Sequence, residues 1–361
     1  MTLRHLLLPF CLLLAGVTPA NAQSQTPRPA AAKADAKTQT AALARSVPAF
    51  NDLPLEEPVK YPSWFKLGIG NLRTEVKEAA KAGKTGIMVY FGQKRCPYCE
   101  KFLRDVELPD ISRELRKHFD VIPVDIWGID EVVTMQGDKL TEQEMAVREQ
   151  AHFTPTVIFY DAKGKEALRL RGYYSPYQFR AALKFITEGF YKTEDFRAYL
   201  ARAKDNAFVF EPGELNQRDF LAPPPFALDR TRRKAQQPLL VLFEQGNCHA
   251  CDLLHTGPLN DRRLVEAVKD FEVVQLDMWS DTPVLTPDGR RTSARKWAED
   301  LNLFYTPSLV FFDEGGKEII RVDHVAQFYR LMGVFEFVRS GGYRTHPNFR
   351  AWRFGRKDEG L

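Results

Sequence analysis

Short apolar runs alternate along the sequence with segments in which apolar residues recur every three or four positions. A run of four to eight residues is typical of a buried strand, whereas the longer spacing marks one apolar face of a helix. Strands are therefore expected at 87–91, 120–127, 156–161 and 166–173. Helices are expected after Asn71, after Cys96, after Asp110, after Thr141 and over 176–188.

Several of these helices carry boundary signals in the sequence. Asn71 is placed to cap the first helix, because its side chain can accept a hydrogen bond from the first turn, and Gly83 is placed to end it. Asp110 is expected to cap the helix that follows it. Thr141 and Glu144 form a capping box at the start of another helix.

The same order of elements recurs in the second half of the chain. Strands are expected there at 239–244, 271–279, 308–313 and 318–323, with a helix from Ser293 and a last helix after the strands. A shift of 152 residues relates the two halves and carries Asp125-Ile126-Trp127 onto Asp277-Met278-Trp279. Alternating strands and helices predict an α/β fold, here in two tandem domains, each a mixed β-sheet flanked by helices. The length of 361 residues suits two domains of roughly 150 residues.

One short chemical pattern occupies the same place in both halves. Residues 96–99 are Cys-Pro-Tyr-Cys and residues 248–251 are Cys-His-Ala-Cys. A Thr-Pro pair follows each motif at constant spacing, so that Pro155 and Pro307 both lie 59 residues after the first cysteine. This regularity indicates a tandem duplication whose repeated feature is a dithiol paired with a proline.

The charge balance excludes one class of partner. The chain has 51 basic and 47 acidic residues, a net charge of only +4 and no basic stripe. A nucleic-acid-binding protein concentrates Lys and Arg on one face, so no nucleic-acid partner is expected. The hydrophobic fraction of 44% suits a globular chain with a sizeable core in each half.

The first 22 residues have the pattern of a targeting segment. Arg4 supplies a positive charge, residues 6–16 an apolar core of 11 residues, and Ala20-Asn21-Ala22 a cleavage site of the small-x-small type. This apolar core is shorter than the roughly 20 residues that a membrane helix needs. We therefore expect a signal peptide at 1–22 and, after its removal, a soluble periplasmic protein.

Composition divides the rest of the chain. Residues 23–60 are rich in Ala, Pro, Gln and Lys, which predicts a flexible tether. The first domain is expected at 61–204 and the second at 231–361. Residues 205–230, which contain three consecutive prolines, are expected to form the linker.

The cysteines of the chain are expected to serve redox chemistry rather than structural disulfides. Apart from Cys11 in the leader, all of them lie in the two motifs, so none is left for a structural disulfide. The thiolate is the nucleophile in disulfide exchange, and a helix N-terminus with nearby positive charge stabilises it. Cys96 begins a predicted helix directly after Lys94 and Arg95. It is therefore expected to attack, while Cys99, one turn later, resolves the mixed disulfide.

The Thr-Pro pairs are the expected substrate-binding residues. A proline in the cis form lifts a backbone edge toward the dithiol, where a partner's chain can pair as an additional strand. Substrate contacts are therefore expected at Thr154, Pro155, Thr306 and Pro307.

These motifs resemble those of the thioredoxin fold. The segments Phe91-Gly92 to Cys99, Asp125-Ile126-Trp127-Gly128 and Phe153-Thr154-Pro155 resemble the periplasmic SoxW-type thioredoxins, and Cys-Pro-Tyr-Cys with a threonine before the later proline is similar to the Dsb isomerase group. The resemblance covers residues 85–361. It implies that Cys96 and Cys248 attack, that Cys99 and Cys251 resolve, and that Pro155 and Pro307 are cis.

One position departs from this resemblance. Thioredoxins and the related Dsb oxidases carry a buried acid six residues before the first cysteine, which helps to deprotonate the resolving cysteine. Tyr90 and Leu242 stand at these positions here. Glu244, four residues before Cys248, is a candidate substitute in the second domain only.

We therefore expect an exported thiol–disulfide oxidoreductase that uses no cofactor and no metal. Its expected partners are cysteine-containing exported proteins and a membrane electron donor or acceptor, and the direction of exchange stays open. Three alternatives are kept. They are an adaptor that docks partners at the Thr-Pro edge without turnover, a second domain without redox activity, and a metal site at the cysteines, with His255 as a further ligand. His249 either tunes the second dithiol or is a plain surface residue.

Overall fold

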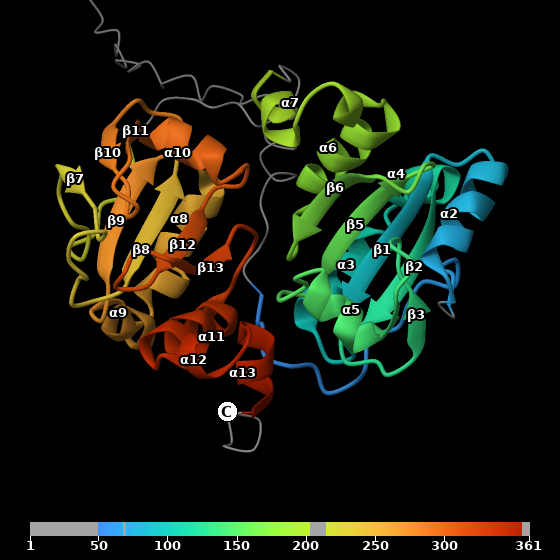
Figure 1. Ribbon diagram of the computed structural model, residues 1–361, viewed down its shortest axis with the longest axis horizontal. Helices are drawn as coiled ribbons and strands as arrows, with labels where there is room; N and C mark the ends of the chain where they lie inside the picture. Colours follow the sequence, from blue (N-terminus) through green and yellow to red (C-terminus); the bar gives the residue numbers. More distant parts are fainter. Residues whose placement is uncertain (1–49, 68–69, 203–213, 356–361) are drawn as a thin grey trace, which may run out of the picture. The chain divides into compact units, whose positions relative to one another are not determined.

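The computed structural model describes residues 50–67, 70–202 and 214–355. The signal peptide predicted at 1–22 lies outside these residues, as does most of the predicted tether. Figure 1 shows a central sheet with surrounding helices in each half of the chain. The predicted α/β architecture, with a mixed sheet in each half, is confirmed.

The first domain is built on a four-stranded sheet in the order β2-β1-β5-β6. β1 runs parallel to β2, and β5 runs antiparallel to both β1 and β6. A separate hairpin is formed by β3 and β4. The strands are β1 (Gly86–Gly92), β2 (Phe119–Asp125), β3 (Glu131–Val133), β4 (Lys139–Thr141), β5 (Thr156–Asp161) and β6 (Glu166–Arg171). The helices are α2 (Leu72–Lys81), α3 (Pro97–Asp105), α4 (Pro109–His118), α5 (Glu142–Arg148), α6 (Pro176–Thr187), η1 (Phe190–Lys192) and α7 (Phe196–Arg202).

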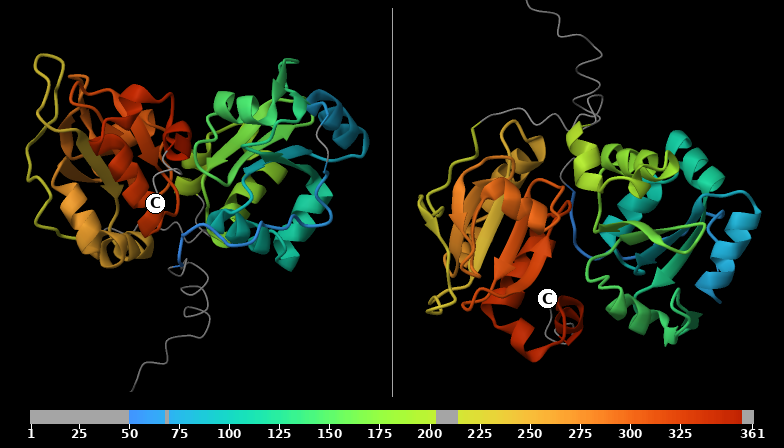
Figure 2. Two further views of the ribbon diagram at one scale, coloured as in Figure 1. Left: turned by 90° about the horizontal axis from the view of Figure 1, so that it is seen from below. Right: turned by 45° about the horizontal axis from the view of Figure 1, so that its top comes forward.

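Helices cover both faces of this sheet, as the further views in Figure 2 show. Every residue of β1 is buried, because its side chains alternate between two apolar cores. Ile87 and Val89 pack with residues of α2 and α5, whereas Met88 and Tyr90 pack with residues of α3, α4 and α6. A strand buried on both faces explains the continuous apolar run in the sequence.

The second domain repeats this sheet in the order β9-β8-β12-β13, with the same parallel and antiparallel pairs. The register shift between Phe159 and Tyr160 recurs between Phe311 and Phe312. The strands of this domain are β7 (Phe226–Ala227), β8 (Leu239–Glu244), β9 (Glu272–Asp277), β10 (Pro283–Leu285), β11 (Arg291–Ser293), β12 (Ser308–Phe312) and β13 (Glu318–Val322). Its helices are α8 (His249–Thr256), η2 (Pro258–Asn260), α9 (Arg262–Val268), α10 (Ala294–Asp300), α11 (Phe328–Arg339), α12 (Gly342–Thr345) and α13 (Phe349–Gly355).

The predicted helix caps are confirmed with one exception. Asn71 accepts hydrogen bonds from the first turn of α2, and Thr141 forms its capping box with Glu144 at the start of α5. Asp110, however, is not a cap: α4 begins one residue earlier, at Pro109, and Asp110 lies in its first turn. The fixed φ of proline favours the first helical position, and this preference sets the boundary.

The prediction of a flexible tether at 23–60 is wrong for its last part, which begins at Phe50. The backbone N–H of Leu55 donates to the carbonyl of Arg95 at 3.2 Å, and that of Val59 donates to the carbonyl of Lys94 at 2.7 Å. The ring of Phe50 packs edge-on against Tyr98. Residues from Phe50 onward therefore belong to the first domain, because scattered apolar residues and two backbone hydrogen bonds hold them there.

The last part of the predicted linker also belongs to a domain, here the second one. Phe226–Ala227, within the stretch 205–230, forms β7 and pairs with β10. Leu228 is buried in the core of the second domain. A short strand after a proline run gave no periodic signal in the sequence.

The two domains contact each other through equivalent residues. Phe153 packs in a core cluster of the second domain, and Tyr305, its counterpart 152 residues later, packs in a cluster of the first. Tyr173 forms an antiparallel β-bridge with Val325, which is again its own counterpart. The duplicated segments thus meet in a reciprocal contact.

The last helix of each domain extends this reciprocity. Arg197 of α7 donates to the carbonyl oxygen of Met278 at 3.3 Å, and Arg350 of α13 donates to the carbonyl oxygen of Ile126 at 2.6 Å. Met278 is the counterpart of Ile126. The Arg197 guanidinium lies over the ring of Trp279, and the Arg350 guanidinium lies over the ring of Trp127. Each arginine satisfies a loop carbonyl of the other domain, which would otherwise be buried without a donor.

His324 makes this contact sensitive to acid. A Cβ at Gly172, which has a φ of +86°, would lie 2.1 Å from the His324 ring, and the Phe153 ring lies 4.7 Å away. Burial lowers the pKa of His324 to about 4, although Asp323 lies 3.6 Å from Nδ1. The imidazole is therefore neutral at pH 7.

We expect the protein to lose stability as the pH falls from about 6.5, where the unfolded histidine takes up a proton, through about 4, where the folded one does. The loss of unfolding free energy is at most about 3 kcal/mol. Urea unfolding of the protein and of His324→Asn at pH 7 and pH 4.5 measures it. The variant should lose the part of the pH dependence that His324 contributes, and an unchanged dependence would assign all of it to other groups.

Candidate active site

The first dithiol lies at the start of α3. Cys96 is the N-cap residue of this helix, and its Sγ accepts a hydrogen bond from the backbone N–H of Cys99 at 3.0 Å. The two cysteines form a disulfide, with Cα atoms 5.1 Å apart. Cys96 is only 1% exposed and Cys99 is fully buried. The N–H of Cys99, in the first turn of the helix, points at the sulfur of Cys96, where it favours negative charge.

The second dithiol has the same geometry. Cys248 is the N-cap residue of α8, and its Sγ accepts a hydrogen bond from the N–H of Cys251 at 3.1 Å. The pair forms a disulfide with Cα atoms 5.2 Å apart. Cys248 is 8% exposed, whereas Cys251 is fully buried. His249 lies exposed in the first turn of the helix.

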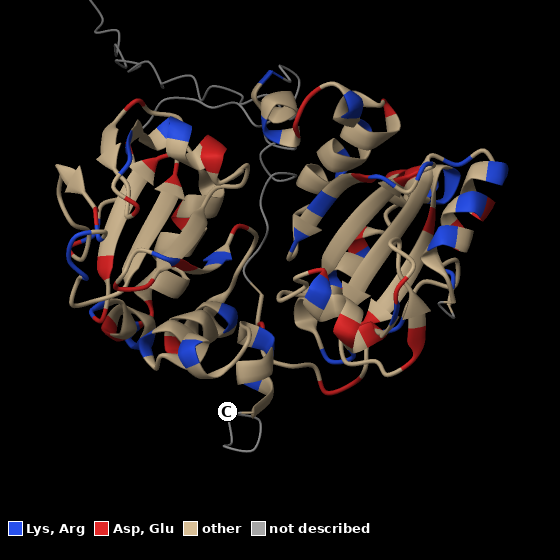
Figure 3. Ribbon diagram, viewed as in Figure 1, with Lys and Arg blue, Asp and Glu red and all other residues tan. Residues whose placement is uncertain are grey.

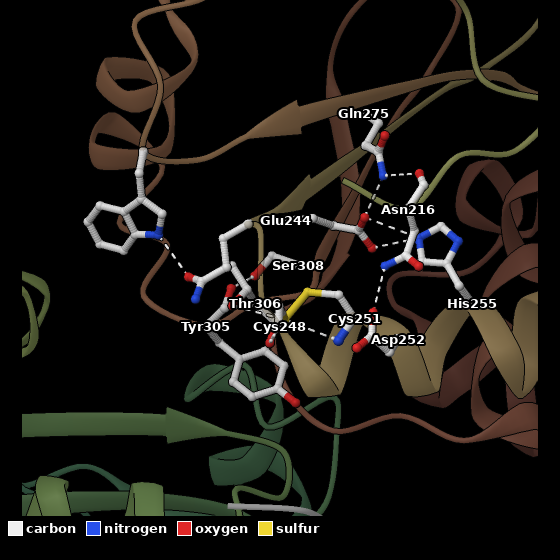
Figure 4. Close-up of a disulfide and its surroundings, with 12 residues drawn as sticks. Asn216, Glu244, Cys248, Cys251, Asp252, His255, Gln275, Tyr305, Thr306 and Ser308 are labelled. Atoms are coloured by element: carbon white, nitrogen blue, oxygen red, sulfur yellow. Dashed lines mark hydrogen bonds and ion pairs between the residues drawn. A yellow bond between two sulfur atoms is a disulfide. The ribbon is translucent and has the colours of Figure 1, made fainter. Parts of the chain in front are cut away.

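Each Thr-Pro pair faces the first cysteine of its domain. The peptide bonds before Pro155 and Pro307 are cis. Cys96 Sγ lies 3.3 Å from the hydroxyl of Thr154 and 3.7 Å from its carbonyl oxygen. In the second domain, Cys248 Sγ lies 3.7 Å from the hydroxyl of Thr306 and 4.0 Å from its carbonyl oxygen. The eight predicted site residues are thus gathered into two equivalent groups. Figure 4 shows Cys248, Cys251 and Thr306 of the second group.

This repeated geometry agrees with a match of the sequence to a known domain. The family model of the thioredoxin-like domain matches residues 72–187 and 227–339, which together make up more than half of the chain. The chain belongs to the thioredoxin-like family. Both halves match, so the two thioredoxin-like domains are members of one family, and their CxxC disulfides are those of a thiol–disulfide oxidoreductase.

Several solved structures are similar to parts of the chain. A thioredoxin-fold protein from Helicobacter pylori is 29% identical over 31% of this chain and 80% of its own, with a TM-score of 0.29. A thioredoxin from Thermus thermophilus is 26% identical over 34% of this chain and 88% of its own, with a TM-score of 0.27. A DsbH oxidoreductase is 17% identical over 36% and 92%, with a TM-score of 0.25. A comparison with curated proteins found no significant match.

The first cysteines of the two motifs differ in solvent exposure. Because Cys248 is 8% exposed and Cys96 only 1%, we expect Cys248 of the reduced protein to react several-fold faster with N-ethylmaleimide. Labelling at alkaline pH, where the thiolate fraction no longer limits the rate, followed by mass spectrometry of the peptides, measures the ratio. Equal labelling of both sites after denaturation is the control. Faster labelling of Cys96 in the folded protein would contradict this prediction.

The basic residues before Cys96 contribute less than the sequence suggested. Lys94 and Arg95 are both exposed, and Lys94 Nζ lies 4.0 Å from a carboxylate oxygen of Asp125. Solvent screens such exposed charges. Figure 3 shows basic and acidic residues interspersed over the elements of each thioredoxin-like domain. Lys94 and Arg95 therefore add little to the positive potential that the helix N-terminus supplies at Cys96.

A buried polar cluster lies beside the second dithiol (Figure 4). Glu244, at the end of β8, is fully buried, and its carboxylate lies 2.9 Å from Nε2 of His255. The side-chain amide of Gln275 donates to the other carboxylate oxygen at 2.6 Å. His255 is one helical turn after Cys251 on the buried face of α8. His255 therefore joins the carboxyl group of Glu244 to the helix that carries Cys251.

The hydrogen bonds around His255 assign its tautomer. The guanidinium of Arg218 donates to Nδ1 at 3.3 Å and also binds the carbonyl oxygen of His255. Arginine has no acceptor atoms, so Nδ1 is the unprotonated nitrogen and Nε2 carries the hydrogen that Glu244 accepts. Two donors, His255 and Gln275, therefore bind the carboxyl group of Glu244.

The first thioredoxin-like domain lacks all three of these polar groups. The counterparts of Glu244, His255 and Gln275 are Gly92, Leu103 and Pro123. The phenol of Tyr90 fills the space instead, because a Cβ at Gly92 would lie 2.6 Å from its oxygen. Burial raises the pKa of Tyr90 well above its usual value, and its hydroxyl has no hydrogen-bond partner among the described residues. The two dithiols therefore differ in the groups available for proton transfer.

The described part of the chain offers neither a metal site nor a membrane-spanning helix. Within it, no group of three or more His, Cys, Asp or Glu side chains is arranged to hold a metal ion. His255, the predicted further ligand, binds Glu244 and Arg218 instead. Within the same residues, no helix has the length and apolar character needed to cross a membrane.

Proposed function

We propose that this protein is an exported thiol–disulfide oxidoreductase that exchanges disulfides with cysteine-containing exported proteins through both dithiols. The observation that carries the proposal is the repeated juxtaposition of a helix-capping cysteine with the threonine carbonyl before a cis proline. The leader pattern at 1–22 supports export to the periplasm. A membrane electron donor or acceptor would then restore the active redox state of the dithiols.

The exchange proceeds in two balanced steps. The thiolate of Cys96 or Cys248 attacks one sulfur of a substrate disulfide, and the other substrate sulfur leaves as a thiolate that takes up a proton. The thiolate of Cys99 or Cys251 then attacks the sulfur of its own partner cysteine and releases the second substrate thiol. The substrate gains two electrons and the CxxC pair loses two. Run in reverse, the same steps oxidise a substrate dithiol.

The Thr-Pro edge supplies the substrate contacts in this proposal. The carbonyl oxygens of Thr154 and Thr306 lie within 3.7 and 4.0 Å of the attacking sulfurs. An extended substrate segment that donates a backbone N–H to such a carbonyl places its disulfide beside the thiolate. Main-chain hydrogen bonds are independent of side chains, so the site suits a range of cysteine-containing proteins.

Insulin reduction with dithiothreitol as electron source tests the proposal. The intact protein should accelerate precipitation of the insulin B chain, and replacing all four motif cysteines with alanine should abolish the effect. Variants with one motif replaced report the share of each domain and whether the second is redox-active. If the intact protein binds unfolded insulin chains but does not accelerate insulin reduction, it is an adaptor instead.

A further inference from the structure

A residue of the second domain reaches the first dithiol. Arg330 in α11 is buried, and its Nη2 donates to the carbonyl oxygen of Thr154 at 2.8 Å. The same oxygen lies 3.7 Å from Cys96 Sγ. The guanidinium and the sulfur of Cys96 therefore both lie close to the same carbonyl oxygen.

The guanidinium also packs on the loop between the two cysteines. Its central carbon lies 3.4 Å from the centroid of the Tyr98 ring. Tyr98 is itself buried and donates from its hydroxyl to a carboxylate oxygen of Asp52 at 2.6 Å. A desolvated guanidinium over an aromatic ring makes a favourable cation–π contact. Arg330 is thus fixed on the Cys-Pro-Tyr-Cys loop as well as on the Thr-Pro edge.

The start of α11 is held in place by the same cluster. Asp52 accepts backbone hydrogen bonds from Tyr329 at 2.9 Å and from Arg330 at 2.8 Å. The backbone N–H of Gln327 donates to the hydroxyl oxygen of Tyr98 at 2.8 Å. Three separate segments therefore converge here: the residues before the first domain's sheet, the CxxC loop and α11.

One donor of Arg330 is left unused. Nη1 is buried and has no hydrogen-bond partner among the described residues. A buried guanidinium nitrogen without an acceptor is costly, so an acceptor in another state of the site is expected. When the disulfide is reduced, the thiolate of Cys96 is the new acceptor that appears in this cluster.

The charge of Arg330 persists at neutral pH. Burial lowers the pKa of Arg330 to about 10, so it stays protonated. The other titratable or charged groups that face it are Asp52, Tyr98, His324 and Arg353. Asp52 already binds a hydroxyl and two backbone N–H groups, and His324 is neutral. Arg330 therefore keeps a positive charge to act on the sulfur.

At the second dithiol, the residues equivalent to Tyr98 and Arg330 do not form such a pair. The counterpart of Tyr98 is Ala250, which offers no ring to stack on. The counterpart of Arg330 is Gln178, whose side chain closes the capping box of α6 with Ser175. The positions equivalent to Arg330 and Tyr98 therefore supply no stacked cation at the second dithiol.

We propose that Arg330 is a positioning residue of the first dithiol, in which the docked second domain stabilises the Cys96 thiolate through the Thr154 carbonyl and the Tyr98 loop. The inference rests on the proposed function, since it concerns the reduced state that exchange requires. Reduction by two glutathione molecules yields one glutathione disulfide, the Cys99 thiol and the Cys96 thiolate, and one proton is released to solvent. Stabilising that thiolate favours the reduced form of the first dithiol.

The test uses the full chain with Cys248 and Cys251 replaced by serine, so that only the first dithiol reports. Thiolate absorbance near 240 nm gives the titration midpoint of Cys96, and glutathione buffers give the redox equilibrium. In Arg330→Gln we expect the midpoint to rise by about one pH unit, and the equilibrium to shift several-fold toward the disulfide. Arg330→Lys keeps the charge and should recover most of both effects.

Arg350→Gln is the matched control, because Arg350 also joins the domains but binds the carbonyl of Ile126, away from the dithiol. It should leave the midpoint and the equilibrium unchanged. The proposal is overturned if Arg330→Gln leaves both readouts unchanged, if Arg350→Gln shifts them equally, or if lysine behaves like glutamine. Failure of the unsubstituted dithiol to exchange with glutathione would instead contradict the proposed function.

Discussion

Insulin reduction should fall by at least about 1000-fold when Cys96 and Cys248 are both replaced by serine. Each is the N-cap residue of its helix and lies beside the Thr-Pro carbonyl. A serine hydroxyl is hardly ionised at neutral pH and cannot form a disulfide with the substrate. Either single replacement should remove only the share of its own domain, because each domain holds a complete site.

The resolving cysteines provide the matched controls. Cys99→Ser and Cys251→Ser keep the attacking sulfur but remove the second step, so each should accumulate a mixed disulfide with the substrate. Non-reducing gels with and without dithiothreitol detect this species. The assignment of roles would be wrong if Cys99→Ser gave no mixed disulfide while Cys96→Ser did.

Local signals in the sequence were sufficient for most of the fold. The caps at Asn71 and Thr141 and the apolar run of β1 depend on neighbouring residues, and the structure confirms them. The duplication added long-range information, because the equal spacing of CxxC and Thr-Pro implied that each pair meets in space. The boundary at Asp110 failed because two helix-start signals competed and Pro109 prevailed.

The contacts between domains left no such local signal. Asp52 lies in a segment whose composition predicts a tether. In the sequence, Arg330 cannot be distinguished from the other charged residues of an amphipathic helix. Their roles depend on which surfaces meet after folding, which periodicity does not encode. The cluster around Glu244 was partly accessible, since comparing the halves position by position shows Gly92, Leu103 and Pro123 all changing to polar residues.

The cluster around Glu244 predicts a second large effect, on the rate at which Cys251 resolves the mixed disulfide. Burial disfavours the thiolate of this cysteine, so its proton must be accepted before it can attack. The carboxyl group of Glu244 is bound by His255 and by Gln275. His255 lies one helical turn after Cys251. In Glu244→Gln we expect the resolving step to slow about 100-fold near pH 7, the scale of general base catalysis, and to recover as the pH rises.

A single-turnover reaction of the reduced protein with Ellman's reagent separates the two steps. In a background with Cys96 and Cys99 replaced by serine, attack by Cys248 releases one thionitrobenzoate, and attack by Cys251 releases the second. Glu244→Gln should slow only the second release. The first dithiol, studied alone, is the internal control, because Gly92 stands where Glu244 would be and its second release should already be slow and steeply pH-dependent. A second release that is equally fast with glutamine at position 244 would show that water or another group takes the proton.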